Sequence, residues 1–334
     1  MRILLAIVVL LALGWSGFWF WNASLRERAL TGWLEQRREA GWVADGSVRV
    51  TGFPNRVDTV VTGLELANPK AGWSWGAPEF QILSQTWRPQ QVIAVWPASQ
   101  SIATPFDRLD VTSDRLVGSL LLEPNQRLGL DHSTLEARGL GLKGSAGWQA
   151  TLGEVLFSIR KAQTETRPFS YDVDFSGKDL ALPDDWLTGI DRGAVPRSID
   201  SAHVAGVASF DRAWDRPAIE GDNPVLQRLA ISEAHFVWGK LDLTAAGTLD
   251  VGPDGLAEGE LKLKAQNWQA MLDAADQAGL IAPGLAGTLR GGLGLLAGLS
   301  GDKRSLSLPL TFRDGQTRLG PVPIGPAPRL AGRT

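Results

Sequence analysis

Strict alternation of apolar and polar residues is the feature that most limits how this chain can fold. In the stretch KLDLTAAGTLDV, residues 240–251, leucines and other apolar residues hold the odd positions, whereas charged residues and threonines predominate at the even ones. A turn sequence follows at 252–255, and Leu261 and Leu263 then alternate with Glu260, Lys262 and Lys264. Because successive side chains of a strand point to opposite faces, this pattern predicts an antiparallel hairpin with one apolar and one hydrated face.

The same period of two recurs along most of the chain. It is found at 48–51, 109–122, 171–175 and 305–312. We therefore predict a mainly β (α+β) fold, in which an N-terminal transmembrane helix precedes a large antiparallel β-sheet body with a few covering helices. Alternation leaves open whether this body is a curved sheet, a groove or a closed sandwich, because each of them buries one strand face.

The C-terminal stretch predicts how the sheet ends. Leu306 to Phe312 should form a strand with its apolar side buried, and Pro309, which lacks an N–H, favours an edge position. Asp314-Gly315 is typical of a type I′ hairpin turn, and the proline-rich residues 320–325 should run extended.

One uncharged segment, Ile3–Trp21, is long enough to cross a bilayer. At a rise of 1.5 Å per residue it spans roughly 28 Å, close to the hydrocarbon thickness. Tryptophans gather at its C-terminal end, where small residues would precede a signal-peptidase site. We therefore predict an uncleaved signal anchor at residues 1–22, with the N-terminus inside and everything after it exported.

A second helix is predicted directly after the anchor, over residues 23–41. Ser24 and Glu27 have the spacing of a capping box, apolar residues recur at helical spacing, and Gly41 can end the helix. This amphipathic helix could be a stalk, could lie on the membrane, or could pack on the following body, and its mixed charges favour packing. The body itself is divided provisionally into a β-rich half at 42–180 and another at 181–334.

Further helices are expected only in the second half. A short one follows Leu182, with Asp184 or Asp185 as its cap. Residues 267–299 contain a pair, of which the first begins at Asn267 as its cap and has Trp268, Met271 and Leu272 in an apolar stripe.

Composition excludes several classes of function. The chain has no cysteine, so disulfides, thiol catalysis and thiolate metal sites are all absent. Its net charge is −3, and its basic residues do not interleave with aromatic ones, which argues against a nucleic-acid partner.

No motif predicts a cofactor, a metal or a catalytic centre. The sequence GLGLKG at 139–144 fits a dinucleotide fingerprint, but strand-like sequence follows it where a helix is required. His132, His203 and His235 lack metal-ligand spacing. Asp184 and Asp185 are more simply explained as a helix cap. We therefore expect no enzyme; an acid–base hydrolase built on these aspartates and His203 is the weakest hypothesis.

Three stretches resemble the bacterial family known as domain of unknown function 2125: GFPNRVD at 52–58, GWSWGAPEFQ at 72–81 with VIAVWP at 92–97, and the terminal residues 309–330. The family usually has an aromatic residue after the first proline, where this chain has Asn55. The resemblance implies a protein anchored in the bacterial inner membrane with its body in the periplasm. More loosely, the architecture is similar to AsmA-like envelope proteins, whose sheets have apolar faces suited to lipid chains.

Two functional hypotheses follow. The first is that the apolar sheet face binds a lipid or another apolar component of the cell envelope; the alternative is a structural or interaction protein of envelope assembly. The predicted lining residues are Leu241, Leu243, Leu249, Leu261, Leu263, Trp73 and Trp75. For each of them, an ordinary core position is the competing interpretation.

Overall fold

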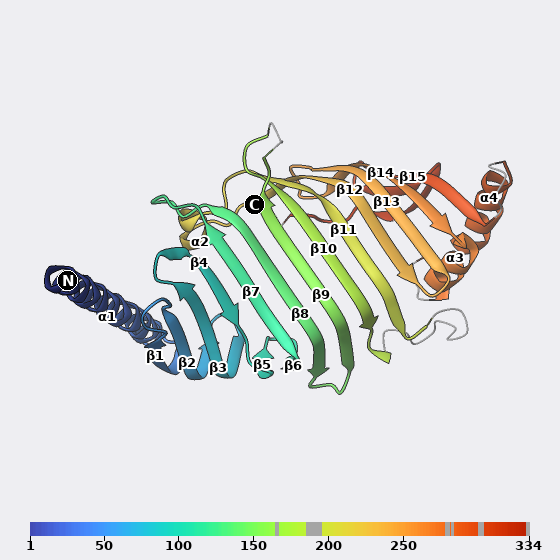
Figure 1. The fold of residues 1–334 in the computed structure, drawn as a ribbon. Coiled ribbons are helices and arrows are strands. Elements are labelled where there is room, and N and C mark those ends of the chain that lie inside the picture. The colour runs from blue at the N-terminus through green and yellow to red at the C-terminus, as the bar shows by residue number, and fades with distance from the viewer. Residues whose placement is uncertain (164–166, 185–195, 278–280, 282–283, 300–303, 332–334) are drawn as a thin grey trace. The chain divides into compact units, whose positions relative to one another are not determined.

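The computed structural model describes the whole chain except residues 164–166, 185–195, 278–280, 282–283, 300–303 and 332–334 (Figure 1). The chain divides into two compact units. Unit 1 comprises residues 1–124 and 135–147, and unit 2 comprises residues 125–134 and 148–334. This division differs from the predicted boundary near 181, because the strand that ends there pairs along nearly its whole length with the strand that follows it.

Unit 1 is a helix followed by an antiparallel sheet. β1 pairs with β2 and β2 with β3; β3 then pairs with β5 through its N-terminal part and with β4 through its C-terminal part. β4 pairs with β7, β5 with β6, and β6 with β8. The elements are α1 (Arg2–Glu39), β1 (Val43–Thr51), β2 (Asp58–Asn68), β3 (Trp73–Gln85), β4 (Arg88–Val95), β5 (Ser99–Ala103), β6 (Arg108–Thr112), β7 (Arg115–Leu122) and β8 (Leu130–Gly144), the last of which belongs to unit 1 from Leu135 onward.

The N-terminal helix is continuous, so the predicted start of a new helix at Ser24 is wrong. Ser24 lies in the interior of α1, and its carbonyl accepts a hydrogen bond from the side chain of Arg28. A capping box would need free amides, which a continuous helix does not have. The predicted stop is confirmed: Gly41 has a φ of +86°, and the amides of Gly41 and Trp42 bond back to Arg38 and Arg37 in a Schellman arrangement.

The C-terminal half of α1 packs on the sheet of unit 1, as its mixed charges predicted (Figure 1). Leu34 is buried in a cluster with Ala44 of β1 and Val61 of β2. Closer to the N-terminus, Trp19 and Ala23 are buried with Val57, which lies in the turn before β2. The helix therefore belongs to the hydrophobic core of unit 1 from Trp19 onward.

Unit 2 is one antiparallel sheet with two helices near its C-terminal strands (Figure 1). Consecutive strands from β9 to β17 pair with one another in chain order, which makes an antiparallel meander. The elements are β9 (Gln149–Lys161), β10 (Ser170–Ala181), β11 (Ser198–Phe210), α2 (Arg216–Glu220), β12 (Leu226–Trp238), β13 (Leu241–Val251), β14 (Ala257–Gln266), α3 (Trp268–Gln277), α4 (Leu285–Leu299), β15 (Ser305–Arg313), β16 (Gln316–Leu319) and β17 (Val322–Pro326).

The predicted helix pair is present as α3 and α4, with one local correction. Asn267 precedes α3, but its side-chain amide donates to the carbonyl of Lys240, and its backbone has a φ of +56°. It therefore ties α3 to the start of β13. The short helix predicted after Leu182 lies largely in residues 185–195, outside the described residues.

The C-terminal strand follows the prediction in most respects. Leu306 and Phe312 are buried, and both Asp314 and Gly315 have positive φ, as a type I′ turn requires. The edge position of Pro309 is wrong, because β15 lies between β14 and β16. Pro309 lacks an N–H, which is tolerated because the β15–β16 ladder stops at the next residue, Leu310. The carbonyl of Pro309 still accepts a hydrogen bond from the amide of Gly320.

A buried aspartate fixes the segment before β12. Asp215 caps α2 by accepting from the amide of Ala218, and it accepts from Arg127 with an Nε–Oδ2 distance of 2.8 Å. Burial raises the pKa of Asp215, but the hydrogen bonds from Arg127 and Ala218 and the guanidinium charge outweigh it, so its pKa lies below the usual value.

We expect Arg127→Gln to destabilise unit 2 more at pH 7 than at acid pH. A depressed folded-state pKa stabilises the protein above the unfolded pKa, roughly 3.9, and this stabilisation is lost as pH falls through the lower folded value. The difference in urea midpoint between wild type and variant should therefore shrink below about pH 4. Arg313→Gln, at an exposed position on β15, is the control; a pH-independent difference for Arg127→Gln would contradict the coupling.

Candidate functional site

The sheet of unit 2 has one face that is almost entirely apolar, which we call the apolar face. Strand register places on it side chains from β9 to β15: Val155, Phe157, Ile159, Val173, Phe175, Val204, Leu229, Ile231, Leu243, Leu249, Leu261, Leu263, Leu308, Leu310 and Phe312. The opposite face carries charged and polar side chains such as Arg160, Asp172, Glu260 and Lys262. The apolar residues that alternate in the sequence therefore form one continuous surface only because the strands pair in this register.

One end of the apolar face is covered by the chain itself. α3 and α4 bury Trp268 and Leu293 against Leu306 of β15, and residues of the C-terminal tail, including Ala327, pack on Leu249 and Leu261. These covering segments form an ordinary hydrophobic core over β13–β15.

The predicted lining leucines lie at this covered end. Leu249 and Leu261 are buried under the tail, with Leu263 at the edge of the same cluster, and Leu241 is buried against Ala274 of α3. Leu243 is half-buried on β13. A ligand on the apolar face would therefore contact other residues before it reached these leucines.

The other end of the apolar face remains open among the described residues. Phe157 of β9 is 39% exposed, and Val204 of β11 is exposed to a similar degree, while Phe175 between them is half-buried. Phe157 and Val204, on either side of Phe175, form the part of this face that can meet another molecule. The alternation of Val155, Phe157 and Ile159 is the sequence pattern from which this exposed part of the face could have been predicted.

Trp73 and Trp75 belong to a separate site in unit 1. Both lie on the same face of β3, as predicted, and both pack at the margin of the cluster around Leu34. The indole N–H of Trp75 donates to Gln100, at 2.7 Å, and the ring of Trp73 meets that of Trp42 edge-on. Their contacts are those of residues packed beneath α1.

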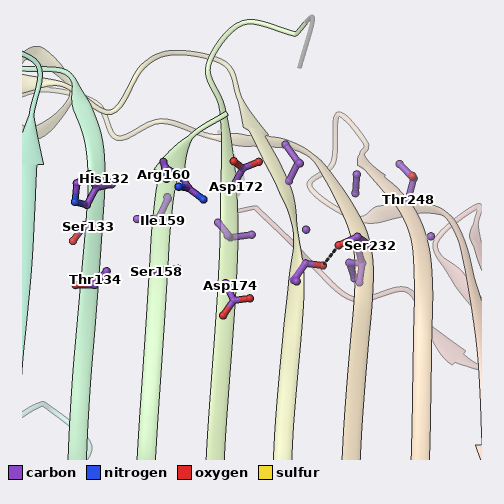
Figure 2. A pocket seen from close by; sticks show the side chains of 17 residues that line it. His132, Ser133, Thr134, Ser158, Ile159, Arg160, Asp172, Asp174, Ser232 and Thr248 are labelled. Atoms are coloured by element: carbon purple, nitrogen blue, oxygen red, sulfur yellow. Dashed lines mark hydrogen bonds between the residues drawn. The ribbon is translucent and has the colours of Figure 1, made fainter. Parts of the chain in front are cut away.

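A hollow of about 800 Å³ is lined by residues of unit 2 (Figure 2). Its side chains come from β8 to β13 and include His132, Ser158, Arg160, Asp172 and Asp174. Arg160, Asp172 and Asp174 belong to the polar face, while Ile159, Val173 and Ile231 of the apolar face also line the hollow.

Glycines underlie this hollow. Gly206 and Gly247 both pair with Ile231 across β12, and all three residues line the hollow. A Cβ on either glycine would overlap a backbone carbonyl of the neighbouring strand, that of Ala230 or of Glu260. Glycine kinks and bulges are devices by which sheets curve, and β12 has a bulge at this point.

Strand pairing joins two histidines that the sequence keeps far apart. His203 and His235 are direct partners on β11 and β12. The ring nitrogen Nε2 of each lies 3.0 Å from an aspartate oxygen, of Asp174 for His203 and of Asp242 for His235. The spacing of the histidines in the sequence did not predict that His203 and His235 are paired, because the bulge in β12 sets which residues face each other.

Within the described residues, no group of three or more histidine or carboxylate side chains is arranged to hold a metal ion. The GLGLKG motif lies inside β8, so no helix N-terminus meets it. Asp185, half of the predicted carboxylate pair, lies outside the described residues.

Together, these features define a class: a one-sided antiparallel β-sheet protein whose N-terminal helix is long and apolar enough to cross a membrane, although a signal sequence would meet the same criterion. The chain belongs to the family described as uncharacterised protein conserved in bacteria, DUF2125, whose model matches residues 19–328. This confirms the predicted family. No curated protein and no solved structure matches the chain.

Proposed function

We propose that α1 holds this protein in the bacterial inner membrane and that its body lies in the periplasm. Cleavage after Trp21 would remove Trp19 from the core that it shares with Val57, and cleavage after Ala23 would remove Ala23 as well. The helix therefore contributes to the hydrophobic core of unit 1 as well as to membrane anchoring, which supports an anchor that is not cleaved. An exported body is what the resemblance to the family implies; the charges do not decide it, because Arg2 precedes the apolar segment and Arg26 and Arg28 follow it.

We further propose that the open end of the apolar face binds a lipid chain or another apolar component of the envelope, without a chemical step. The observation that carries this proposal is the uneven covering of one continuous apolar surface. α3, α4 and the tail cover it over β13–β15, whereas Phe157 and Val204 are left exposed on β9 and β11. The predicted similarity to AsmA-like proteins agrees with this proposal but stays a prediction.

A photocrosslinking experiment tests the ligand, since the two faces of β9 offer a matched pair. Phe157 lies on the apolar face and is 39% exposed, and its neighbour Leu156 lies on the polar face and is 42% exposed. We expect a diazirine amino acid at position 157 of the full chain, irradiated in bacterial cells, to give phospholipid adducts by mass spectrometry. The same amino acid at position 156 should give severalfold fewer.

Each outcome separates the hypotheses. Lipid adducts at 157 alone support binding on the apolar face. A discrete protein adduct at 157 favours the alternative, a structural or interaction protein of envelope assembly. Equal labelling at 156 and 157, or only water-quenched product at both, would overturn the lipid proposal.

A further inference from the structure

The turn at residues 52–57, here called the Phe53 turn, lies beside the apolar part of α1 and not beyond it. The indole N–H of Trp15 donates to the carbonyl of Pro54, at 3.1 Å. The indole N–H of Trp19 donates to the carbonyl of Arg56, at 2.7 Å. These two bonds fix the level of the turn along the helix axis.

Ring contacts reinforce this placement. Phe53 stacks on Phe20, with ring centroids 5.5 Å apart, and meets the edge of Trp19 at 5.4 Å. The turn and the last part of the apolar run are therefore one packed unit.

The lengths involved require the turn to enter the membrane. Trp15 lies about 9 Å before the end of the apolar run at Trp21. If the Phe53 turn stayed outside the lipid, only Arg2–Gly14 would be left to cross, about 20 Å of helix against a hydrocarbon core of about 30 Å. A full crossing by Ile3–Trp21 places Pro54 at the depth of Trp15 and Phe53 at that of Phe20, near the end of the apolar run.

The backbone of the turn suits such an environment. Irregular backbone at membrane depth is tolerated where its polar groups have partners. The carbonyls of Pro54 and Arg56 accept hydrogen bonds from the indoles of Trp15 and Trp19. The carbonyl of Gly52 accepts from the amide of Arg56, and that of Asn55 accepts from the amide of Thr86.

The exposed side chains are those found at membrane interfaces. Phe53 is 48% exposed, and Trp87, which follows Thr86 in the adjoining turn, is 55% exposed. Aromatic rings favour the boundary between headgroups and acyl chains. Arg88 follows Trp87 and is exposed, and arginine pairs with lipid phosphates; Arg56, also exposed, is already paired with Asp58 at 2.9 Å.

We propose that the Phe53 turn and Trp87 insert into the interface of the phospholipid bilayer beside α1, so that unit 1 is docked on the membrane as well as tethered to it. This inference rests on the membrane anchor proposed above. The occupant is the bilayer, because the docking surface is continuous with the apolar segment of α1.

The absence of cysteine makes the test direct, because single cysteines need no altered background. The full chain is reconstituted in vesicles of phosphatidylethanolamine and phosphatidylglycerol with a spin label at Phe53→Cys or Trp87→Cys. Leu10→Cys, at an exposed position in the apolar run, reports the anchor. Phe106→Cys is the control: Phe106 is 96% exposed and follows β5, which pairs with the end of β3 away from the Phe53 turn.

Collision of each label with oxygen and with a water-soluble nickel chelate gives its depth. We expect labels at 53 and 87 to collide severalfold less with the chelate than the label at 106, while all variants keep the wild-type unfolding temperature. If the label at position 10 lies in lipid but the labels at 53 and 87 collide with the chelate as often as the label at 106, the inference is overturned and the anchor is not. A label at position 10 that collides with the chelate as often as the label at 106 would overturn both the anchor and the inference.

Discussion

Replacing Trp19 by alanine should lower the free energy of unfolding of unit 1 by about 3–5 kcal/mol, as truncation of a buried tryptophan does. Trp19 is 4% exposed, lies over Val57, and donates its indole N–H to Arg56. The substitution leaves a cavity between α1 and the sheet, and it also leaves the carbonyl of Arg56 without this donor.

Trp21→Ala is the matched control, because Trp21 lies on the same helix and is 60% exposed. Its effect should stay within about 0.5 kcal/mol. Denaturant unfolding of the detergent-solubilised full chain, followed by circular dichroism, measures both variants. Equal destabilisation by the two substitutions would show that the helix does not pack on unit 1 through Trp19.

The second large effect is expected at a glycine of the unit 2 sheet. A Cβ on Gly247 would overlap the carbonyl oxygen of Glu260 and come within 2.9 Å of the Cα of Leu261. Both atoms belong to the backbone of β14, so relief requires the two strands to move apart. We expect Gly247→Ala to destabilise unit 2 by about 3 kcal/mol, the upper part of the usual range for overpacking.

Gly325 on β17 provides the control, since no heavy atom lies within 4 Å of the Cβ that an alanine would add. Gly325→Ala should change the stability by no more than about 0.5 kcal/mol. Urea midpoints of the two variants make the comparison. If Gly247→Ala is as stable as Gly325→Ala, the close approach of β13 and β14 at this point is refuted.

Much of the fold follows from local sequence. The alternation at 240–251 and 260–264 predicted β13 and β14, and the apolar run predicted the N-terminal part of α1. Turn chemistry at Asp314-Gly315 predicted the connection after β15. These features depend on the period of side chains along the chain or on backbone preferences of single residues, which need no distant partner.

Local rules failed where packing overrode them. Ser24 and Glu27 have capping-box spacing, yet α1 runs through them, because Trp19 and Leu34 on either side pack on the same sheet and hold the helix together. Pro309 favoured an edge, but the tail adds another strand beside it. Tertiary contacts outweigh propensities of this size.

The sequence by itself determined that this chain has strands with one apolar side, a helix able to cross a membrane, and membership of its family, because these depend on residue periodicity and composition. Only the tertiary structure decided which part of the apolar face is covered and which is open at Phe157, that His203 faces His235, and that Trp15 and Trp19 bind the Phe53 turn. The physical reason is that register, bulges and the docking of remote segments are set by pairings between residues far apart in the chain, and a one-residue shift in register would exchange the two faces.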